Sequence, residues 1–234
     1  KYGMIFFKEF PDHELKPSVA RVLVEVLYVQ GEYAEAYQIC SEIRPEMDPG
    51  TKIREIPDFV QGACAYHLDK FEECETLMEE YLSYYPQGER VEPVKFYYAS
   101  AKVRLMKWEE AGPLLEEFIT AYPASPMKPS ALFLSGLTQL VLEDLDLAEQ
   151  RINELQDEYP NAPEIPGSYN VEGDILAARS DEYEAIIAAY REGKRLVEEA
   201  GRGSQDVGAY STRQLLGQPC GVTDWKESAG FFDH

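Results

Sequence analysis

Bulky apolar side chains recur along the chain at nearly constant intervals, and each is followed three residues later by a small or apolar one. The five bulky positions, called anchors below, lie 38, 37, 37 and 38 residues apart. They are Tyr33, Phe71, Trp108, Leu145 and Tyr183, and the residues that follow them are Ala36, Cys74, Ala111, Ala148 and Ile186. A period of this length is typical of repeat proteins, in which each repeat is one structural unit stacked on the next.

Two sets of prolines divide each repeat into a pair of predicted helices. Four aromatic residues directly precede a proline, and a second proline follows six or seven residues after the first. The residue before a proline is pushed out of the α region, so the aromatic–proline pair ends one helix. The second proline suits the first turn of the next helix. The pattern therefore predicts a helix A, such as 129–142, and a helix B that opens at the anchor, such as 108–121.

Small residues predict that the two helices of a repeat pack closely. Gly62, Ala99 and Gly136 each lie nine residues before an anchor, on helix A. The small residue three positions after the anchor lies on helix B. Small side chains on both helices, once per repeat, indicate a tightly packed helical hairpin.

The segment Gly31-Glu-Tyr33-Ala-Glu-Ala36 resembles a tetratricopeptide repeat (TPR), whose common form has 34 residues. The repeats here are longer by about three residues, in the loops at 122–126 and 159–163. This length resembles the repeats of bacterial envelope proteins of the TolA-binding cell-division-coordinator and outer-membrane-assembly-lipoprotein types. The resemblance implies an all-α, right-handed α-solenoid of about five helix-turn-helix repeats. The chain departs from the pattern at the irregular first-to-second junction, residues 44–57, and at Ile186, where a small residue is expected.

The markers predict three regions. Residues 1–16 read as the end of a preceding repeat that has been cut through. Residues 17–200 read as the solenoid, with units at about 17–56, 57–92, 93–128, 129–165 and 166–200. Residues 201–234 read as a Gly-rich linker and an irregular tail, with a short helix near 209–216.

Composition and charge exclude several classes of function. The net charge is -21, from 22 basic and 43 acidic residues, which argues against nucleic-acid binding because phosphate contacts need clustered Lys and Arg. No apolar run approaches the length of a transmembrane helix. The four cysteines show no CxxC spacing, so we expect no metal site. No nucleophile, acid–base pair or Gly-rich phosphate loop is recognisable, and we expect neither a catalytic residue nor a cofactor. Paired glutamates on helix B indicate a solvated outer face.

Helix A carries the candidate binding residues, because it lines the concave side of such solenoids. Phe59, Phe96 and Phe133 occupy one position in three successive repeats, each 37 residues after the last. Two interpretations stay open for these rings: they form core between neighbouring repeats, or they form an aromatic ladder that takes a peptide. The full candidate set on the concave face is Tyr28, Phe59, Tyr66, His67, Phe96, Lys102, Arg104 and Phe133. Its two basic residues, Lys102 and Arg104, favour a partner segment that is apolar with some acidic side chains.

The sequence therefore predicts a non-catalytic interaction scaffold from a bacterium, which binds another protein or a peptide segment on its concave face. Two alternatives are a structural spacer in a larger assembly and a regulatory domain of a longer protein, whose other parts are then candidate partners. Self-association through the truncated N-terminal repeat is a further alternative. The envelope resemblance tilts the expected location toward the periplasm.

Overall fold

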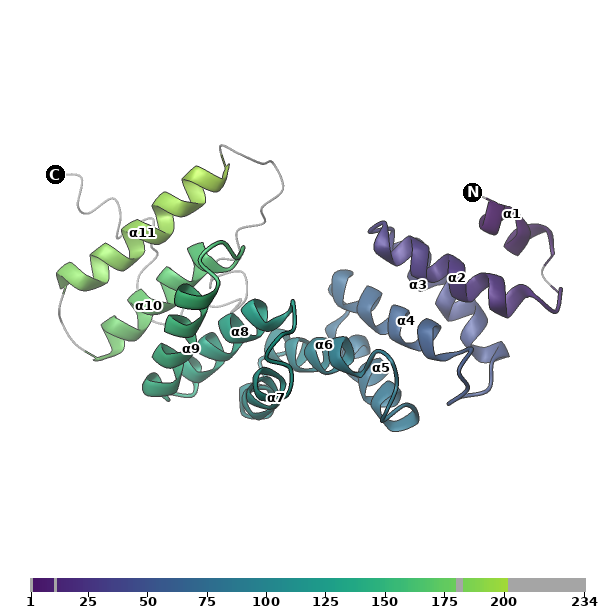
Figure 1. Cartoon of the computed structure of the whole chain (residues 1–234), viewed down its shortest axis with the longest axis horizontal. Helices are drawn as coiled ribbons and strands as arrows, with labels where there is room; N and C mark the ends of the chain where they lie inside the picture. The colour runs from purple at the N-terminus through teal and green to yellow at the C-terminus, as the bar shows by residue number, and fades with distance from the viewer. Residues whose placement is uncertain (1, 11, 180–182, 202–234) are drawn as a thin grey trace. The chain divides into compact units, whose positions relative to one another are not determined.

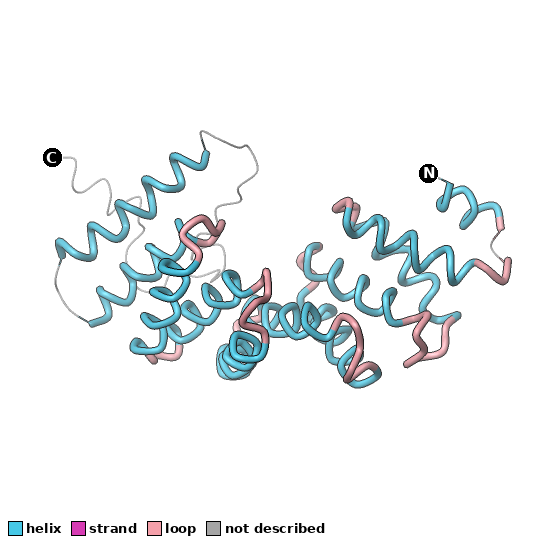
Figure 2. The backbone as a smooth tube through the Cα atoms, viewed as in Figure 1, coloured by secondary structure: helices cyan, strands magenta, loops and turns pink. Residues whose placement is uncertain are grey.

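The computed structural model describes residues 2–10, 12–179 and 183–201, and within these ranges the chain folds into helices and loops alone (Figures 1 and 2). The expected short helix near 209–216 lies outside the described residues. The helices are α1 (Tyr2–Glu9), α2 (Lys16–Val29), α3 (Tyr33–Ile43), the 3₁₀ helix η1 (Arg44–Glu46), α4 (Glu55–His67), α5 (Phe71–Tyr84), α6 (Val91–Arg104), α7 (Trp108–Ala121), α8 (Lys128–Val141), α9 (Leu145–Glu158), α10 (Ile165–Arg179) and α11 (Tyr183–Gly201).

Successive helices pair as the repeat predicts. The five anchors are the first residues of α3, α5, α7, α9 and α11, so every predicted helix B begins where its anchor stands. Each of these helices packs against the helix before it, which is the helix A of the same repeat. The predicted fold class, an all-α solenoid of helical hairpins, is confirmed.

The chain divides into two compact units, residues 1–122 and 123–234. In the first unit, α4 packs against both α2 and α6, so three successive A helices lie side by side. In the second unit, α10 packs against α8 as well as against α9 and α11. Contacts between the A helices of successive repeats therefore continue the stack within each unit.

Glycine allows the close approach of helix A to helix B. A Cβ atom on Gly136 would lie 2.7 Å from Cδ1 of Ile152, and one on Gly62 would lie 2.9 Å from Cε of Met78. Both distances are shorter than a van der Waals contact, so a larger residue would require the Ile152 or Met78 side chain on helix B to shift. The predicted tight hairpin is therefore present in the second and fourth repeats.

Each of the first four A helices ends in the same left-handed turn, two residues before the anchor. The residues in the turn are Gly31, Asp69, Met106 and Glu143, with φ of 79°, 57°, 57° and 62°. The next residue donates its N–H back into the helix, as from Lys107 N to Lys102 O at 2.9 Å. This six-residue hydrogen bond and the left-handed residue define a Schellman motif, which satisfies carbonyl groups that a helix end otherwise leaves free.

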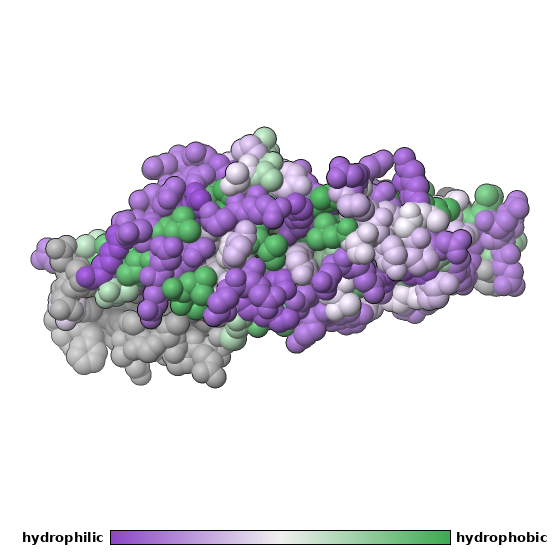
Figure 3. Space-filling view, turned by 90° about the horizontal axis from the view of Figure 1, so that it is seen from below, coloured by the Kyte–Doolittle hydropathy of each residue, from purple (hydrophilic) through white to green (hydrophobic). Residues whose placement is uncertain are grey.

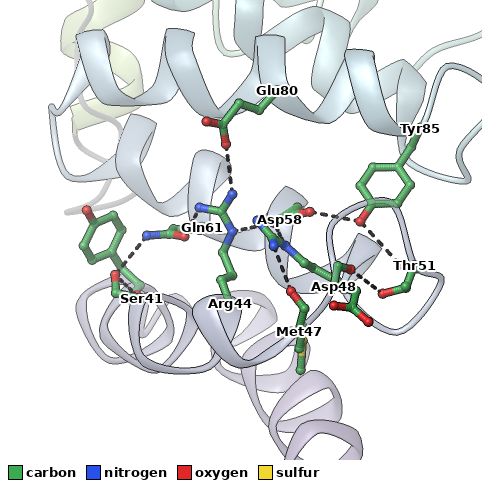
Figure 4. Close-up of polar contacts among 11 residues, drawn as sticks. Ser41, Arg44, Met47, Asp48, Thr51, Asp58, Gln61, Glu80 and Tyr85 are labelled. Carbon is green, nitrogen blue, oxygen red and sulfur yellow. Dashed lines mark hydrogen bonds and ion pairs between the residues drawn. The ribbon is translucent and has the colours of Figure 1, made fainter.

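The junction between the first and second repeats is longer than the others because it encloses a polar network (Figure 4). Arg44, at the end of α3, pairs with the buried Asp58 of α4 and donates to Oε1 of Gln61 at 2.6 Å. The hydroxyl of Tyr85 donates to the other oxygen of Asp58 at 3.0 Å. The network thus ties both repeats together.

A second arginine completes the network from the loop. Arg54 donates to Asp58 at 3.1 Å and to the carbonyl oxygen of Met47 at 2.9 Å. Asp58 is 2% exposed, and a buried carboxylate is tolerated only when its oxygens are paired. The irregular segment predicted at 44–57 is therefore held in place by this network, although residues 48–50, 52 and 53 stay exposed.

Candidate functional site

Five aromatic side chains of the first unit gather around the C-terminal ends of α2 and α4, and we call them the aromatic cluster. They are Tyr28 from α2, Tyr33 from the start of α3, Tyr66 and His67 from the end of α4, and Tyr97 from α6. The ring of His67 stacks on Tyr33 with centroids 4.1 Å apart and planes 8° apart. The rings of Tyr66 and Tyr97 lie 5.3 Å apart. Three successive repeats therefore contribute to one surface.

Tyr97 is the centre of the cluster. Its hydroxyl lies 2.9 Å from the hydroxyl of Tyr28 and 3.2 Å from Nε2 of His67. Tyr97 is 7% exposed, whereas Tyr28, Tyr33 and Tyr66 are half-buried and His67 is exposed. A buried ring thus supports a rim of accessible rings around it.

Burial changes the protonation behaviour of the cluster. Although part of His67 is exposed, the rings packed around its imidazole partly desolvate it and lower its pKa below the usual value of 6.5, because they disfavour the charged imidazolium. Burial also raises the pKa of Tyr28, an effect that its hydrogen bond to Tyr97 only partly offsets. Both side chains are therefore held in their neutral forms near neutral pH, and the surface they offer is apolar with polar tips.

The position-matched phenylalanines lie mainly in the core. Phe59 is 6% exposed and Phe133 is 4% exposed, and Phe133 belongs to the second unit. Phe96 keeps more exposure, but its ring packs against Tyr97 and Phe118 at centroid distances of 5.8 and 5.6 Å. Phe59 and Phe133 consequently offer little surface to a docked peptide, as the core interpretation of these rings requires.

Lys102 does not supply a basic charge to this face, which corrects the expectation from sequence. The residue is 4% exposed, and its Nζ lies 2.7 Å from Glu75 and 2.6 Å from Glu110. Those carboxylates come from α5 and α7, so the ammonium group is directed toward the B helices. A charge that is already paired by two carboxylates adds little attraction for a partner.

Arg104 remains as the basic side chain beside the cluster. Its guanidinium carbon lies 4.3 Å from the centre of the Phe71 ring. Its nearest carboxylate, Asp69, is 3.4 Å away and belongs to an exposed side chain. The arginine is thus held in place by a cation–π contact, and the ion pair is weak because solvent reaches it.

Sequence reasoning missed Tyr97 and Tyr33 as members of the cluster. Tyr97 lies eleven residues before its anchor, where the second and fourth repeats have Val60 and Leu134. An aromatic residue at a position that is aliphatic in the neighbouring repeats is the signal that could have identified it. From the sequence, Tyr33 is predicted only as an anchor. Its place in the aromatic cluster depends on the conformation of the turn between α2 and α3.

The outer face differs from the cluster in polarity. The acidic pairs predicted on helix B are exposed on α5 and α7, as Glu79, Glu80, Glu109 and Glu110 show. Figure 3 shows hydrophilic residues over most of the surface in its view, with apolar residues in small separate patches.

Within the described ranges, no three His, Cys, Asp or Glu side chains form a group suited to a metal ion. The same part of the chain contains no helix of the length and apolarity that crossing a membrane needs.

Comparison with known proteins identifies relatives of the fold. A family model described as "YfiO: Outer membrane lipoprotein" matches residues 58–197, which is more than half of the chain. No curated protein sequence matches the chain. Among solved structures, MamA from Desulfovibrio magneticus RS-1 has 20% identity and a TM-score of 0.61, over 82% of this chain and 97% of that chain. YrrB, a TPR protein described as having an unusual peptide-binding site, has 13% identity and a TM-score of 0.62, over 86% of this chain and 98% of that chain.

Proposed function

Because the chain belongs to the YfiO family of outer membrane lipoproteins, we propose that it is a non-catalytic interaction scaffold of the bacterial cell envelope. Its TPR fold is of the kind that serves protein–protein interaction. In this proposal, the A helices of the first unit bind a segment of another protein. The aromatic cluster is the docking surface.

The observation that carries this proposal is the accessible rim of the cluster. Tyr28, Tyr66 and His67 were all candidates from sequence, and their rings lie around the buried Tyr97. Aromatic side chains suit binding because they bury a large area while losing few rotatable bonds. The rings are also held by ring–ring contacts and hydrogen bonds, so little conformational entropy remains to be lost when a partner docks.

The chemistry of the surface indicates the kind of segment that fits. The neutral rings favour apolar or aromatic side chains. Arg104, beside the cluster, favours a carboxylate. We therefore propose an apolar segment with at least one acidic residue as the partner, which also suits the exclusion of nucleic acid by the charge of -21.

A structural spacer is the second candidate, and the burial of Phe59 and Phe133 favours it. A spacer stacks its repeats through core contacts and needs no accessible aromatic surface on the A helices. The two functions differ in whether the rim of the cluster contacts a partner, and variants of the rim therefore separate them.

The test is affinity capture from the lysate of the native host with the whole chain as bait. The double variant Tyr66→Ala with Arg104→Glu alters the rim and leaves the buried Tyr97 in place. The matched control, Glu79→Ala with Glu109→Lys, changes two exposed residues of the B helices. Circular dichroism checks that both variants keep the helicity of the parent.

We expect the rim variant to lose one specific partner that the parent and the control retain. Binding of a synthetic peptide from that partner should then weaken by roughly tenfold to a hundredfold, as is typical for loss of an aromatic anchor. Retention of every partner by a folded rim variant would refute the docking surface and favour the spacer.

A further inference from the structure

An open pocket of about 490 Å³ lies in the second unit, between the start of α8 and the loop that joins α9 to α10 (helices labelled in Figure 1). Its volume falls within the range of about 300–1,000 Å³ that is usual for ligand sites. Tyr159 contributes an aromatic ring to the wall, and four prolines contribute rigid apolar surface. The prolines are Pro126, Pro129, Pro160 and Pro163. The pocket shares no residue with the aromatic cluster.

The first residue of helix A explains why this space is open in the fourth repeat. In the second repeat that residue is Glu55, which accepts the N–H of Glu89 in the next loop at 2.7 Å. In the fourth repeat it is Lys128, whose Nζ pairs with Glu154 and Glu158 of α9 at 2.8 and 3.0 Å. The loop after α9 therefore receives no side chain from the first residue of its helix A, and space remains beside it.

Hydrogen-bond acceptors outnumber donors in the lining of the pocket. A proline has no N–H group. The N–H groups of Tyr159 and Ala162 donate to the carbonyl oxygens of Leu155 and Tyr159 at 3.0 and 2.9 Å. Glu158 and Glu164 add carboxylates, and the lining residues include no basic side chain. The pocket therefore suits a group that donates hydrogen bonds and carries a positive charge.

Glu164 has only one of its two carboxylate oxygens satisfied. That oxygen accepts from the hydroxyl of Ser130 in α8, and the other is buried without a hydrogen-bond partner. An unpaired acceptor that water does not reach raises the free energy of the protein. A donor that enters the pocket and turns this carboxylate toward itself removes that cost.

Tyr159 and Glu158 favour a cation from the other side of the loop. The ammonium group of Lys128 lies 5.7 Å from the centre of the Tyr159 ring, within the reach of a cation–π contact. Two carboxylates share this ammonium group, so it repels a second cation only weakly. The side chain of Glu158 is 53% exposed and keeps acceptor sites free for a ligand.

We propose that the pocket binds an arginine side chain of a partner protein. The guanidinium group has five N–H donors and no acceptor, and its planar fork binds a carboxylate such as that of Glu164 through two parallel hydrogen bonds. Its flat face stacks on the ring of Tyr159, and its alkyl stem packs against the prolines. Lysine fits less well, because its ammonium group is compact and strongly hydrated.

The second unit thus prefers a basic segment, whereas the proposed partner of the aromatic cluster is apolar with an acidic residue. The net charge of -21 attracts a basic partner over longer distances, and salt screens this attraction. Binding at the pocket should therefore weaken as ionic strength rises.

Titration of the whole chain with blocked tripeptides tests the proposal. The probe is acetyl-Gly-Arg-Gly-amide, and the matched peptides carry lysine or the uncharged isostere citrulline in place of arginine. The backbone N–H signals of Asn161 and Ala162 in nuclear magnetic resonance spectra report on the pocket, because both residues line it. We expect the arginine peptide to bind with a Kd on the order of 1 mM, and the citrulline peptide at least about tenfold more weakly.

Variants of the lining locate the bound peptide. The double variant Glu158→Gln with Glu164→Gln removes both charges and keeps an oxygen for the Ser130 hydroxyl, and it should raise the Kd of the arginine peptide at least about tenfold. Ala162→Phe fills part of the pocket without a change of charge and should also weaken binding. The control, Glu184→Gln, neutralises an exposed residue outside the lining and should bind as the parent does. Circular dichroism checks that every variant keeps its helicity.

Three results would overturn the proposal. The first is equal binding of the arginine and citrulline peptides, and the second is a double variant that binds the arginine peptide as tightly as the control does. The third is equal binding of the lysine peptide, which would show that the pocket selects positive charge alone. None of these results depends on the aromatic cluster, so they leave the proposed docking surface of the first unit to its own test.

Discussion

The hydroxyl groups of Tyr28 and Tyr97 lie 2.9 Å apart and join α2 to α6 across the helix between them. Repeat proteins are usually held by contacts between adjacent repeats alone. Here a direct hydrogen bond links the first repeat to the third. The stability of the first unit therefore includes a contact between repeats that are not adjacent. A model that adds only the interaction energies of adjacent repeats omits this contact.

Removing that hydroxyl should destabilise the first unit. Tyr97→Phe loses the hydrogen bonds to Tyr28 and His67 while the ring stays in place, and we expect the free energy of unfolding to fall by about 1–2 kcal/mol. Urea denaturation followed by circular dichroism measures the change. Tyr84→Phe is the control, because Tyr84 is 46% exposed and should shift stability by less than about 0.5 kcal/mol. Equal effects in the two variants would contradict the structural role of the Tyr97 hydroxyl.

Breaking the polar network at the first junction should have a larger effect. Asp58→Ala leaves Arg44 and Arg54 without their shared buried carboxylate, and we expect a loss of about 3–5 kcal/mol in unfolding free energy. Glu80→Ala removes a partner of Arg44 that is half exposed and 3.1 Å away, and it should cost about 1 kcal/mol or less. Chemical denaturation of both variants provides the comparison. A small effect of Asp58→Ala would show that the network is not essential to the core.

The left-handed turns allow stabilisation by glycine. Met106 has a φ of 57°, which is strained for a residue with a Cβ atom, and its side chain is 46% exposed. Met106→Gly should raise the unfolding free energy by about 0.5–1 kcal/mol, because relief of strain outweighs the added entropy of the unfolded chain. The reverse change, Gly31→Ala, should lower it by about 1 kcal/mol. Thermal and urea unfolding test both signs, and stabilisation by Gly31→Ala would contradict the argument.

The lowered pKa of His67 makes stability depend on pH. At pH values between its folded-state pKa and 6.5, the unfolded chain binds a proton at His67 that the folded chain does not. The contribution of His67 to the unfolding free energy is therefore highest above pH 6.5, the pKa of its side chain in the unfolded chain. It falls as the pH drops below 6.5 toward the folded-state pKa. We expect the parent to lose more unfolding free energy than His67→Gln between about pH 7.5 and about pH 5.5. Identical pH profiles of the two proteins would contradict a lowered pKa.

The fold followed from the sequence because its signals are local and repeated. Each marker of the repeat acts within one hairpin: the anchors such as Trp108, the small residues such as Gly136, and the prolines. Five copies of the pattern therefore determine where the helices begin. The Schellman turns were not predicted, since Met106 and Glu143 are not residues that usually mark a left-handed conformation. Their conformation follows from the packing of the hairpin.

The candidate site was only partly predictable. Tyr28, Tyr66 and His67 lie together as their spacing on helix A predicts. The prediction that Lys102 presents a basic charge on the concave face is wrong. Helical spacing gives only the face on which its Cα atom lies, whereas its long side chain reaches the carboxylates of neighbouring helices. Sequence spacing also could not decide between core and groove for Phe59, because that choice depends on how the adjacent repeat packs.

The polar network of the first junction limits how this chain can be rearranged during evolution. The later junctions have a regular 37-residue spacing, so duplication or deletion of a whole unit there preserves every marker of the repeat. Arg44 and Arg54 instead require Asp58 from the next repeat, which in turn is bound by Tyr85, the residue that follows the B helix of that repeat. The first two repeats must therefore be inherited together, and changes in the length of the array are expected only beyond them.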